Sequence, residues 1–183
     1  MSAYRCRVAE AMTAAREAAG VSQRELADRL GRDKRTIQKW EKGEMKIALE
    51  DFLALEAAGW KGRGGTAVSC SPAEIEFLRQ TVRNLAACGR VRIDRLRLDG
   101  RTLASSIIFL TGDQAWCFKI CYDESQAASS PGSQLVMYIT SELLADPSIA
   151  RADSCTPPNR PFMSKFWGEQ LAPTARFAAP QGL

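Results

Sequence analysis

Apolar residues in the first third of the chain recur at the three- and four-residue spacing of helices, and Gly20, Gly31, Gly43 and Gly59 separate these periods. Glycine commonly ends a helix, because it adopts the left-handed conformation without a steric penalty. Residues 5–59 show no strand-like alternation. The pattern predicts a run of short helices in this part of the chain.

Residues 61–71 are rich in glycine and small side chains, which is the composition of a linker. We therefore expect an N-terminal domain over residues 1–60 and a second domain over residues 72–171. Residues 172–183 are rich in proline and alanine, and we expect this tail to fray.

The second domain begins with a helix signal and continues with strand signals. Ser71-Pro72-Ala73-Glu74 is a capping box with proline at the first helical position, and apolar residues follow at helical spacing up to Gly89. Asp99-Gly100 and Thr111-Gly112-Asp113 are turn signals between segments of strand character. We expect strands over 91–98, 103–110 and 115–122, a helix over 133–145, a short strand near 149–155 and a last helix over 161–171.

The predicted fold class is therefore α+β, with an all-α N-terminal bundle and a C-terminal antiparallel sheet flanked by helices. Within residues 91–98 the apolar positions change phase between Ile93 and Leu96. Such a change inside one strand is typical of a β-bulge, which we expect there.

Residues 21–43 carry the sharpest local signal. Ser22 and Glu25 form a capping box for one short helix, and Asp33 can cap the next. Gly31 lies between the two helices, so the segment has the form of a helix-turn-helix. If Ile37 and Trp40 face inward, the outward residues of the second helix are basic or amide side chains: Lys34, Arg35, Gln38 and Lys39.

Such side chains bind base edges and phosphates, because arginine and lysine donate to guanine and glutamine pairs with adenine. Gln23 and Arg24, at the start of the preceding helix, are placed to contact backbone phosphates. The alternative is a solvated basic face that contacts no DNA.

Residues 5–59 resemble the Cro and phage-repressor (Xre) helix-turn-helix family. The residues that carry the resemblance are Ala14-Ala15-Arg16-Glu17-Ala18-Ala19-Gly20, Ser22-Gln23, Leu26-Ala27, Leu30-Gly31, Thr36-Ile37 and Trp40-Glu41-Lys42-Gly43. It implies a bundle of four or five helices whose last helix contains Leu49, Phe52, Leu53 and Leu55, a DNA surface made by Gln23, Lys34, Arg35, Thr36, Gln38 and Lys39, and a structural ion pair between Arg16 and Glu41.

The second domain resembles the central part of the GNAT acetyltransferase fold, in particular the CelD type related to the FemABX-like group. The residues that carry this resemblance are 96–104, 116–124, 130–135, 153–155 and 162–167. It implies that the helix N-terminus at Ser130, Gly132, Ser133 and Gln134 binds the pyrophosphate of an acyl-CoA. Because the region before residue 72 is assigned to the helix-turn-helix, we expect the first strand and helix of that fold to be absent.

The sequence contains no histidine, which excludes a Ser-His-Asp triad, a Cys-His dyad and an HExxH zinc site. Its six cysteines form no CxxC pair, so we expect no metal site and reduced thiols. Cys117 and Cys121 would share one face of a strand, and this leaves a thiol switch open. No apolar run is long enough to span a bilayer, so we expect a cytoplasmic protein without a membrane partner.

The hypothesis that these patterns favour is a sequence-specific DNA-binding transcriptional regulator that binds double-stranded DNA as a homodimer. In this hypothesis the GNAT-like domain serves dimerisation, a protein partner or effector sensing, and no enzymatic activity is required of it; if the chain is an enzyme, the resemblance implies a GNAT-type acyltransferase. No cofactor is expected, although acetyl-CoA is a candidate ligand. Two alternatives remain: an acyl-CoA-dependent N-acyltransferase with a helix-turn-helix targeting module, and an antitoxin-like module that masks a protein.

Overall fold

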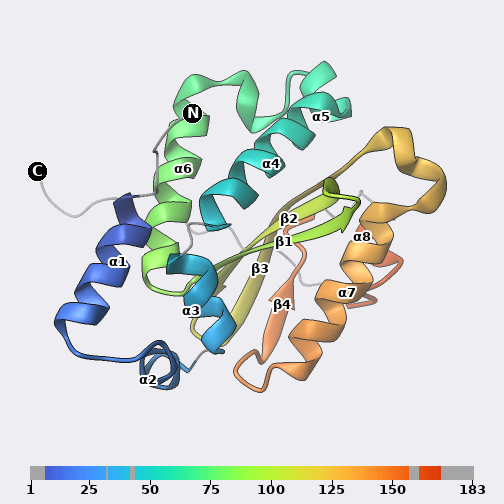
Figure 1. Ribbon diagram of the computed structural model, residues 1–183. Coiled ribbons are helices and arrows are strands. Elements are labelled where there is room, and N and C mark those ends of the chain that lie inside the picture. Colours follow the sequence, from blue (N-terminus) through green and yellow to red (C-terminus); the bar gives the residue numbers. More distant parts are fainter. Residues whose placement is uncertain (1–6, 32, 42–43, 157–160, 170–183) are drawn as a thin grey trace, which may run out of the picture.

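The computed structural model describes residues 7–31, 33–41, 44–156 and 161–169. A four-stranded sheet lies at its centre, with helices on both faces (Figure 1), so the predicted α+β class is confirmed. The strands are β1 (Val91–Leu98), β2 (Arg101–Thr111), β3 (Gln114–Tyr122) and β4 (Arg151–Asp153), in the order β1-β2-β3-β4. The first three are antiparallel neighbours, whereas β4 is parallel to β3.

The turns between the first three strands follow from their residue types. Asp99 and Gly100 both have positive φ, 48° and 80°, which is the requirement of a tight hairpin turn. Gly112, in the next turn, has φ 59°. The predicted antiparallel meander is therefore present, with each strand within two residues of its expected ends.

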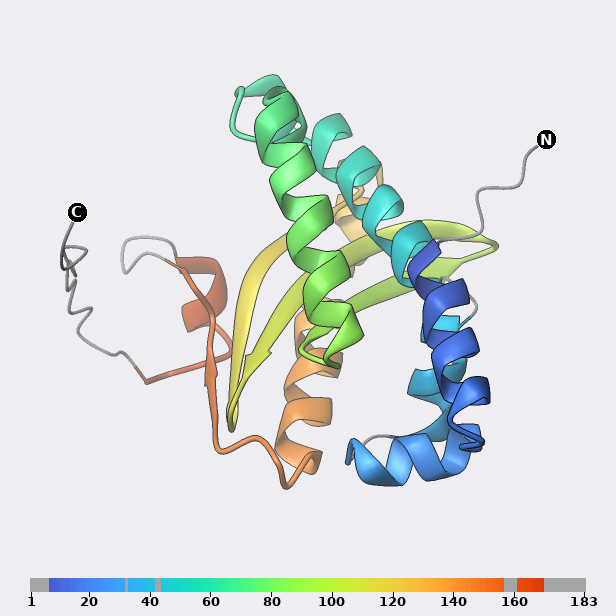
Figure 2. The same ribbon diagram turned by 90° about the vertical axis from the view of Figure 1, so that its left-hand side faces the viewer.

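Helices α4 (Glu44–Ala58) and α6 (Pro72–Ala87) cover one face of the sheet (Figure 1 and Figure 2). Ser71 caps α6, since its side chain accepts from the N–H of Glu74 at 3.3 Å. The core on this face combines residues of both helices with residues of three strands: Leu49, Phe52, Leu53, Val68, Leu78, Val82, Ala86, Val91, Ile107 and Cys121.

This packing corrects the expectation of an N-terminal helical bundle that is separate from the sheet. Leu49, Phe52 and Leu53 belong to α4 and are buried against the sheet, instead of completing a separate N-terminal bundle. An apolar helix stripe shows that a helix is packed but not which surface covers it, and this is why the pattern was misassigned.

The expected linker over residues 61–71 contains two short helices, α5 (Trp60–Arg63) and η1 (Val68–Cys70). Ala67 and Val68 are buried, and Val68 is part of the core shared by α4 and α6. The glycine-rich composition of this segment therefore serves tight turns. A Cβ atom on Gly62, for example, would overlap the carbonyl oxygen of Ala57.

Helix α7 (Pro131–Ala145) covers the opposite face of the sheet, with Leu135, Ile139 and Leu143 buried against it. Before it lies η2 (Glu124–Ser129). After β4, helix α8 (Pro161–Ser164) is shorter than the helix expected over 161–171, of which residues 170–171 lie outside the described part.

The N-terminal helices are α1 (Arg7–Ala18), α2 (Gln23–Arg29) and α3 (Lys34–Glu41). Ser22 caps α2 by accepting from the N–H of Glu25 at 3.1 Å, and the Asp33 carboxylate accepts from the N–H of Arg35 at 2.6 Å. Ala27 and Ile37 form a small cluster between α2 and α3. A separate all-α domain is not shown, because α4, the helix expected to complete it, packs on the sheet instead.

Two irregularities interrupt the strand pairing. The β1–β2 register shifts between Leu96 and Arg97, so the extra residue is Leu103 on β2. Ile93 and Leu96 pack on opposite faces of the sheet, which explains the change of phase in the sequence. A second shift, between Ile107 and Ile108, makes Phe118 the extra residue of β3.

Among the described residues, every helix is too short or too polar to cross a membrane.

Candidate active site

A cavity of about 560 Å³ opens where β3 and β4 separate. The two strands pair only through Gln114–Trp116 and Arg151–Asp153, whereas β3 continues to Tyr122. Residues from both sides of the sheet line the cavity: Glu56, Lys61 and Lys119 on the side of α4, and Gly132, Val136 and Ile139 on the side of α7. The gap between parallel strands is therefore a passage from one face of the sheet to the other.

The bulge at Phe118 determines which side chains of β3 reach each side. The ring of Phe118 lies 5.1 Å from that of Phe109, which packs on the α4–α6 side. Lys119 also reaches α4, whereas Cys117 and Ile120 pack on the α7 side. Two consecutive residues thus face α4, which regular alternation does not allow.

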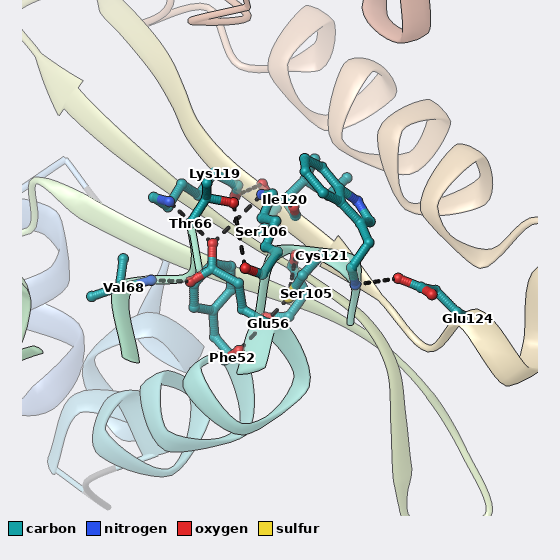
Figure 3. A network of polar contacts seen from close by, with 12 residues as sticks. Phe52, Glu56, Thr66, Val68, Ser105, Ser106, Lys119, Ile120, Cys121 and Glu124 are labelled. Atoms are coloured by element: carbon teal, nitrogen blue, oxygen red, sulfur yellow. Dashed lines mark hydrogen bonds and ion pairs between the residues drawn. The ribbon is translucent and has the colours of Figure 1, made fainter. Parts of the chain in front are cut away.

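The carboxylate of Glu56 forms the centre of a polar network on the α4 side (Figure 3). Glu56 is only 1% exposed. Its Oε1 accepts from Lys119 Nζ at 3.1 Å and lies 3.5 Å from Lys61 Nζ, and its Oε2 accepts from the N–H of Val68 at 2.9 Å. A buried carboxylate requires such partners, because its desolvation is costly without them.

Lys61 links this network to the edge of β3. Its Nζ donates to the carbonyl oxygen of Ile120 at 2.9 Å. Burial is the largest influence on its ammonium group and lowers its pKa, while Glu56 acts in the opposite direction. The side chains of Lys61 and Lys119 remain 20% and 23% exposed, and both residues line the cavity.

Glu124, at the start of η2, connects the end of β3 to α5. Its Oε1 accepts from the N–H of Trp60 at 2.5 Å, and its Oε2 forms an ion pair with Arg63. The hydrogen bond from Arg63 lowers the pKa of Glu124, so this carboxylate is ionised at neutral pH. The charge of Glu124 is therefore neutralised by Arg63 at the rim of the cavity.

Three cysteines line the cavity. Burial raises the pKa of Cys117 and of Cys121 to about 12, and that of Cys155 to about 11. Cys121 packs on the α4 side and Cys117 on the α7 side, so the expectation that they share one face is wrong. The bulge at Phe118 lies between them and reverses the alternation.

The N-terminus of α7 borders the α7 side of the cavity. Ser130, at its N-cap, has φ 49°, and Pro131 and Gly132 are buried. A Cβ atom on Gly132 would lie 3.2 Å from Cδ1 of Tyr122, so glycine permits the close approach of this turn to β3. The N–H groups of Gly132 and Ser133 belong to the first turn, which provides no intrahelical acceptor for them.

The four residues expected to bind pyrophosphate differ in position. Gly132 lines the cavity and Ser133 is half-buried, whereas Ser130 and Gln134 are exposed. The side-chain amide of Gln134 donates to the carbonyl oxygen of Ser129 at 2.6 Å, so it stabilises the turn that begins α7.

The residues predicted to contact DNA lie on α2 and α3, away from the cavity. Arg24, Lys34 and Arg35 are exposed, while the side chains of Thr36 and Lys39 lie outside the described part. Gln23 donates to Glu41 at 2.7 Å and accepts from Gln38 at 3.4 Å, so both amides have partners within the protein.

Arg16 and Glu41 form an ion pair that joins α1 to α3, with a second contact of 3.2 Å between Nη2 and Oε2. Arg16 also donates to the carbonyl oxygen of Val21 at 3.0 Å. Both side chains are largely buried, so the pair fixes how these helices cross.

The fold and the cavity define a protein with a ligand passage between two diverging parallel strands and a helix N-terminus at one side of it. The model of the acetyltransferase (GNAT) domain family matches residues 7–160, and the chain belongs to this family. The match includes the N-terminal helices as well as the sheet.

Two solved structures are similar to the chain. One is an acetyltransferase of Trypanosoma brucei, 13% identical, with a TM-score of 0.49, covering 73% of this chain and 94% of its own. The other is a ribosomal-protein-alanine N-acetyltransferase from Brucella melitensis biovar Abortus 2308, 12% identical, with a TM-score of 0.48 and coverage of 75% and 94%. No curated protein matches the sequence.

These findings overturn the hypothesis of a DNA-binding regulator. The acetyltransferase family model spans nearly the whole chain, including the segment assigned to the Xre family, and it supports the fold of a GNAT acetyltransferase. Helix caps and a basic face occur on many short helices that only face solvent, so their coincidence over residues 21–43 was weaker evidence than it seemed.

The sequence patterns described above do not identify Glu56, Lys61 or Lys119 as site residues. A signal for Lys119 was present, because it is a lysine between apolar residues in the middle of a strand. Glu56 follows a strongly apolar stretch of α4 in a similar way. Their association across 63 residues could not be foreseen without the sheet topology.

Proposed function

We propose that the protein is an N-acetyltransferase that transfers the acetyl group of acetyl-CoA to an amine. The observation that carries this proposal is the cavity at the divergence of β3 and β4, which borders the N-terminus of α7. The acetyltransferase family of the chain supports it, since members of that family use acetyl-CoA as a substrate.

In this proposal the CoA pyrophosphate binds at the N-terminus of α7. The free N–H groups of Gly132 and Ser133 and the positive end of the helix dipole favour an anion there. The closeness of Gly132 to Tyr122 supports this assignment, because a larger residue would displace the turn or the ring. The pantetheine arm then follows the unpaired edge of β3 through the passage.

The reaction requires an uncharged amine to attack the thioester carbonyl. The new C–N bond forms, the C–S bond breaks, and the proton lost by the amine ends on the CoA thiol. Because the extra residue of a bulge has no ladder partner, we assign the backbone N–H of Phe118 to the carbonyl oxygen, where negative charge develops.

The proposal is tested with the full chain, acetyl-CoA and mixtures of primary amines, with acetylated products identified by mass spectrometry. We expect acetylation that depends on protein and is lost in Gly132→Val. A protein that neither binds acetyl-CoA nor acetylates any amine would contradict the proposal. Mass spectrometry is preferable to a thiol assay for CoA, because Cys70 and Cys88 are exposed.

A further inference from the structure

The charges that line the α4 side of the cavity do not balance. Lys61 and Lys119 both interact with the single carboxylate of Glu56, through the same oxygen. The other carboxylate of the lining, Glu124, is neutralised by Arg63. Among the described ionisable groups at this end of the cavity, one positive charge therefore lacks a counter-charge.

An uncompensated charge in such a site is unfavourable, because the cavity wall is largely apolar and offers little solvation. Glu56 cannot neutralise both lysines, since its Oε2 is occupied by the N–H of Val68 and it carries a single charge. An ammonium group has three donors, and Lys119 uses one of them for Glu56. Donors of the two lysines thus remain for a ligand.

The position of this charge relative to the donor site is also informative. Gly132 and the α7 N-terminus border the α7 side of the passage, and the two lysines lie on the α4 side. If acetyl-CoA occupies the α7 side, the acceptor approaches from the side of Lys61 and Lys119. The charge therefore belongs to the part of the cavity that the acceptor fills.

We propose that the acceptor carries a carboxylate, which binds between Lys61 and Lys119. This inference rests on the proposed acetyltransferase function and names the substrate class of the same site. A single uncompensated positive charge matches a monoanion, so a carboxylate fits better than a doubly charged phosphate ester. The acceptor class is then an amine that also bears an acid group, such as an amino acid.

A bound carboxylate has a further consequence for Lys61. Burial lowers its pKa and the charge of Glu56 opposes that effect, so a second anion would stabilise the ammonium form further. Protonation of Lys61 therefore favours binding of the carboxylate, and binding of the carboxylate favours protonation of Lys61.

The test is calorimetric titration of the full chain, first with CoA and then, in the presence of CoA, with three probes of similar shape: 3-phenylpropionate, 3-phenylpropionamide and phenyl phosphate. We expect the acid to bind at least about tenfold more tightly than its amide, since only the acid pairs its charge with the ammonium groups of the two lysines. We also expect it to bind more tightly than phenyl phosphate.

Three variants assign the effect to residues. Lys119→Met and Lys61→Met keep the length of the side chain and remove its charge, and each should reduce acid binding to the level of the amide. Lys34→Met, on the exposed face of α3, is the matched control and should keep the preference. Two lysine variants are used so that the test survives if one of them does not fold.

The outcomes distinguish failure of the carboxylate site from failure of the proposed acetyltransferase function. If the acid and the amide bind alike, if neither binds, or if the preference survives in both lysine variants, the carboxylate site is wrong. Tighter binding of phenyl phosphate would contradict the choice of a monoanion. Failure of CoA to bind would contradict the proposed function, and the acid and amide titrations are then compared on the free protein.

Discussion

Lys119, in the middle of β3, donates at 3.1 Å to the buried carboxylate of Glu56 on α4. A charged hydrogen bond thus joins the sheet to its covering helix at the wall of the cavity. The same carboxylate accepts from Val68 in η1 and lies beside Lys61 of α5. Glu56 therefore fixes two segments that a glycine-rich sequence would otherwise leave loosely placed.

Glu56→Ala should lower the free energy of unfolding by about 3–5 kcal/mol, because it leaves two ammonium groups and the N–H of Val68 without their partner. Glu56→Gln should cost less, since its amide oxygen can still accept one of these bonds. Urea denaturation followed by circular dichroism measures both. Glu76→Ala, on the exposed face of α6, is the control and should change stability by about 0.5 kcal/mol or less. Equal effects of Glu56→Ala and Glu76→Ala would contradict the role of the network.

The buried cysteines should resist alkylation. A thiolate is the reactive form, and burial raises the pKa of Cys117 and Cys121 to about 12, so their thiolates are scarce at pH 8. Iodoacetamide followed by peptide mass spectrometry should modify the exposed Cys70 and Cys88 first and Cys121 only after denaturation. The rate for Cys117 should still rise about tenfold for each pH unit between 8 and 10. Rapid labelling of Cys121 in the native protein would show that α4 does not cover it.

Gly132→Ala should weaken acetyl-CoA binding, because the added methyl group would lie 3.2 Å from Cδ1 of Tyr122 and would displace the first turn of α7. We expect a loss of about tenfold in affinity, which corresponds to the 1–3 kcal/mol cost of overpacking. The matched control is Gly168→Ala, where the new Cβ atom would have no neighbour within 4 Å. Calorimetric titration with acetyl-CoA measures the affinity of both variants. An unchanged affinity for acetyl-CoA in Gly132→Ala would show that the first turn of α7 does not bind acetyl-CoA.

The Arg16–Glu41 pair should contribute to stability in a pH-dependent manner. The hydrogen bond from Arg16 lowers the pKa of Glu41 below its ordinary value of 4.5, so the contribution is complete above that pH and is lost as the pH falls through the lowered value. Glu41→Gln should therefore lower the melting temperature at pH 7, with a difference that shrinks below about pH 4.5.

Glu25→Gln is the control for this experiment, because Glu25 pairs with Arg29 at an exposed site. Exposed pairs contribute little, so this variant should melt close to the wild type at every pH. A difference for Glu41→Gln that does not depend on pH would mean that its ionisation is not involved.

Local signals in the sequence predicted local structure well. The cap at Ser71, the turn at Asp99-Gly100 and the strands around it are present, because short-range sterics and hydrogen bonds determine them. The role of α4 could not be predicted in this way. Phe52 and Leu53 have the same spacing whether they pack on a small helical bundle or on a sheet.

The candidate site depended even more on long-range contacts. The GNAT resemblance implied that Gly132 belongs to the donor site, and Gly132 lines the cavity. The parallel pairing of β4 with β3 was not foreseen, and it creates the divergence in which the cavity lies. The bulge at Phe118 leaves no clear mark in the sequence, yet it directs Lys119 toward Glu56.

In the proposed reaction acetyl-CoA is the donor, and its acetyl group is transferred to an amine. It is tested directly by calorimetric titration of the full chain with acetyl-CoA, followed by incubation of the same complex with mixtures of primary amines that include amino acids, and by mass spectrometry of the products. We expect saturable binding of one acetyl-CoA for each chain and acetylated amino acids among the products. If acetyl-CoA does not bind, or if it binds and no amine is acetylated, the protein does not have the proposed function.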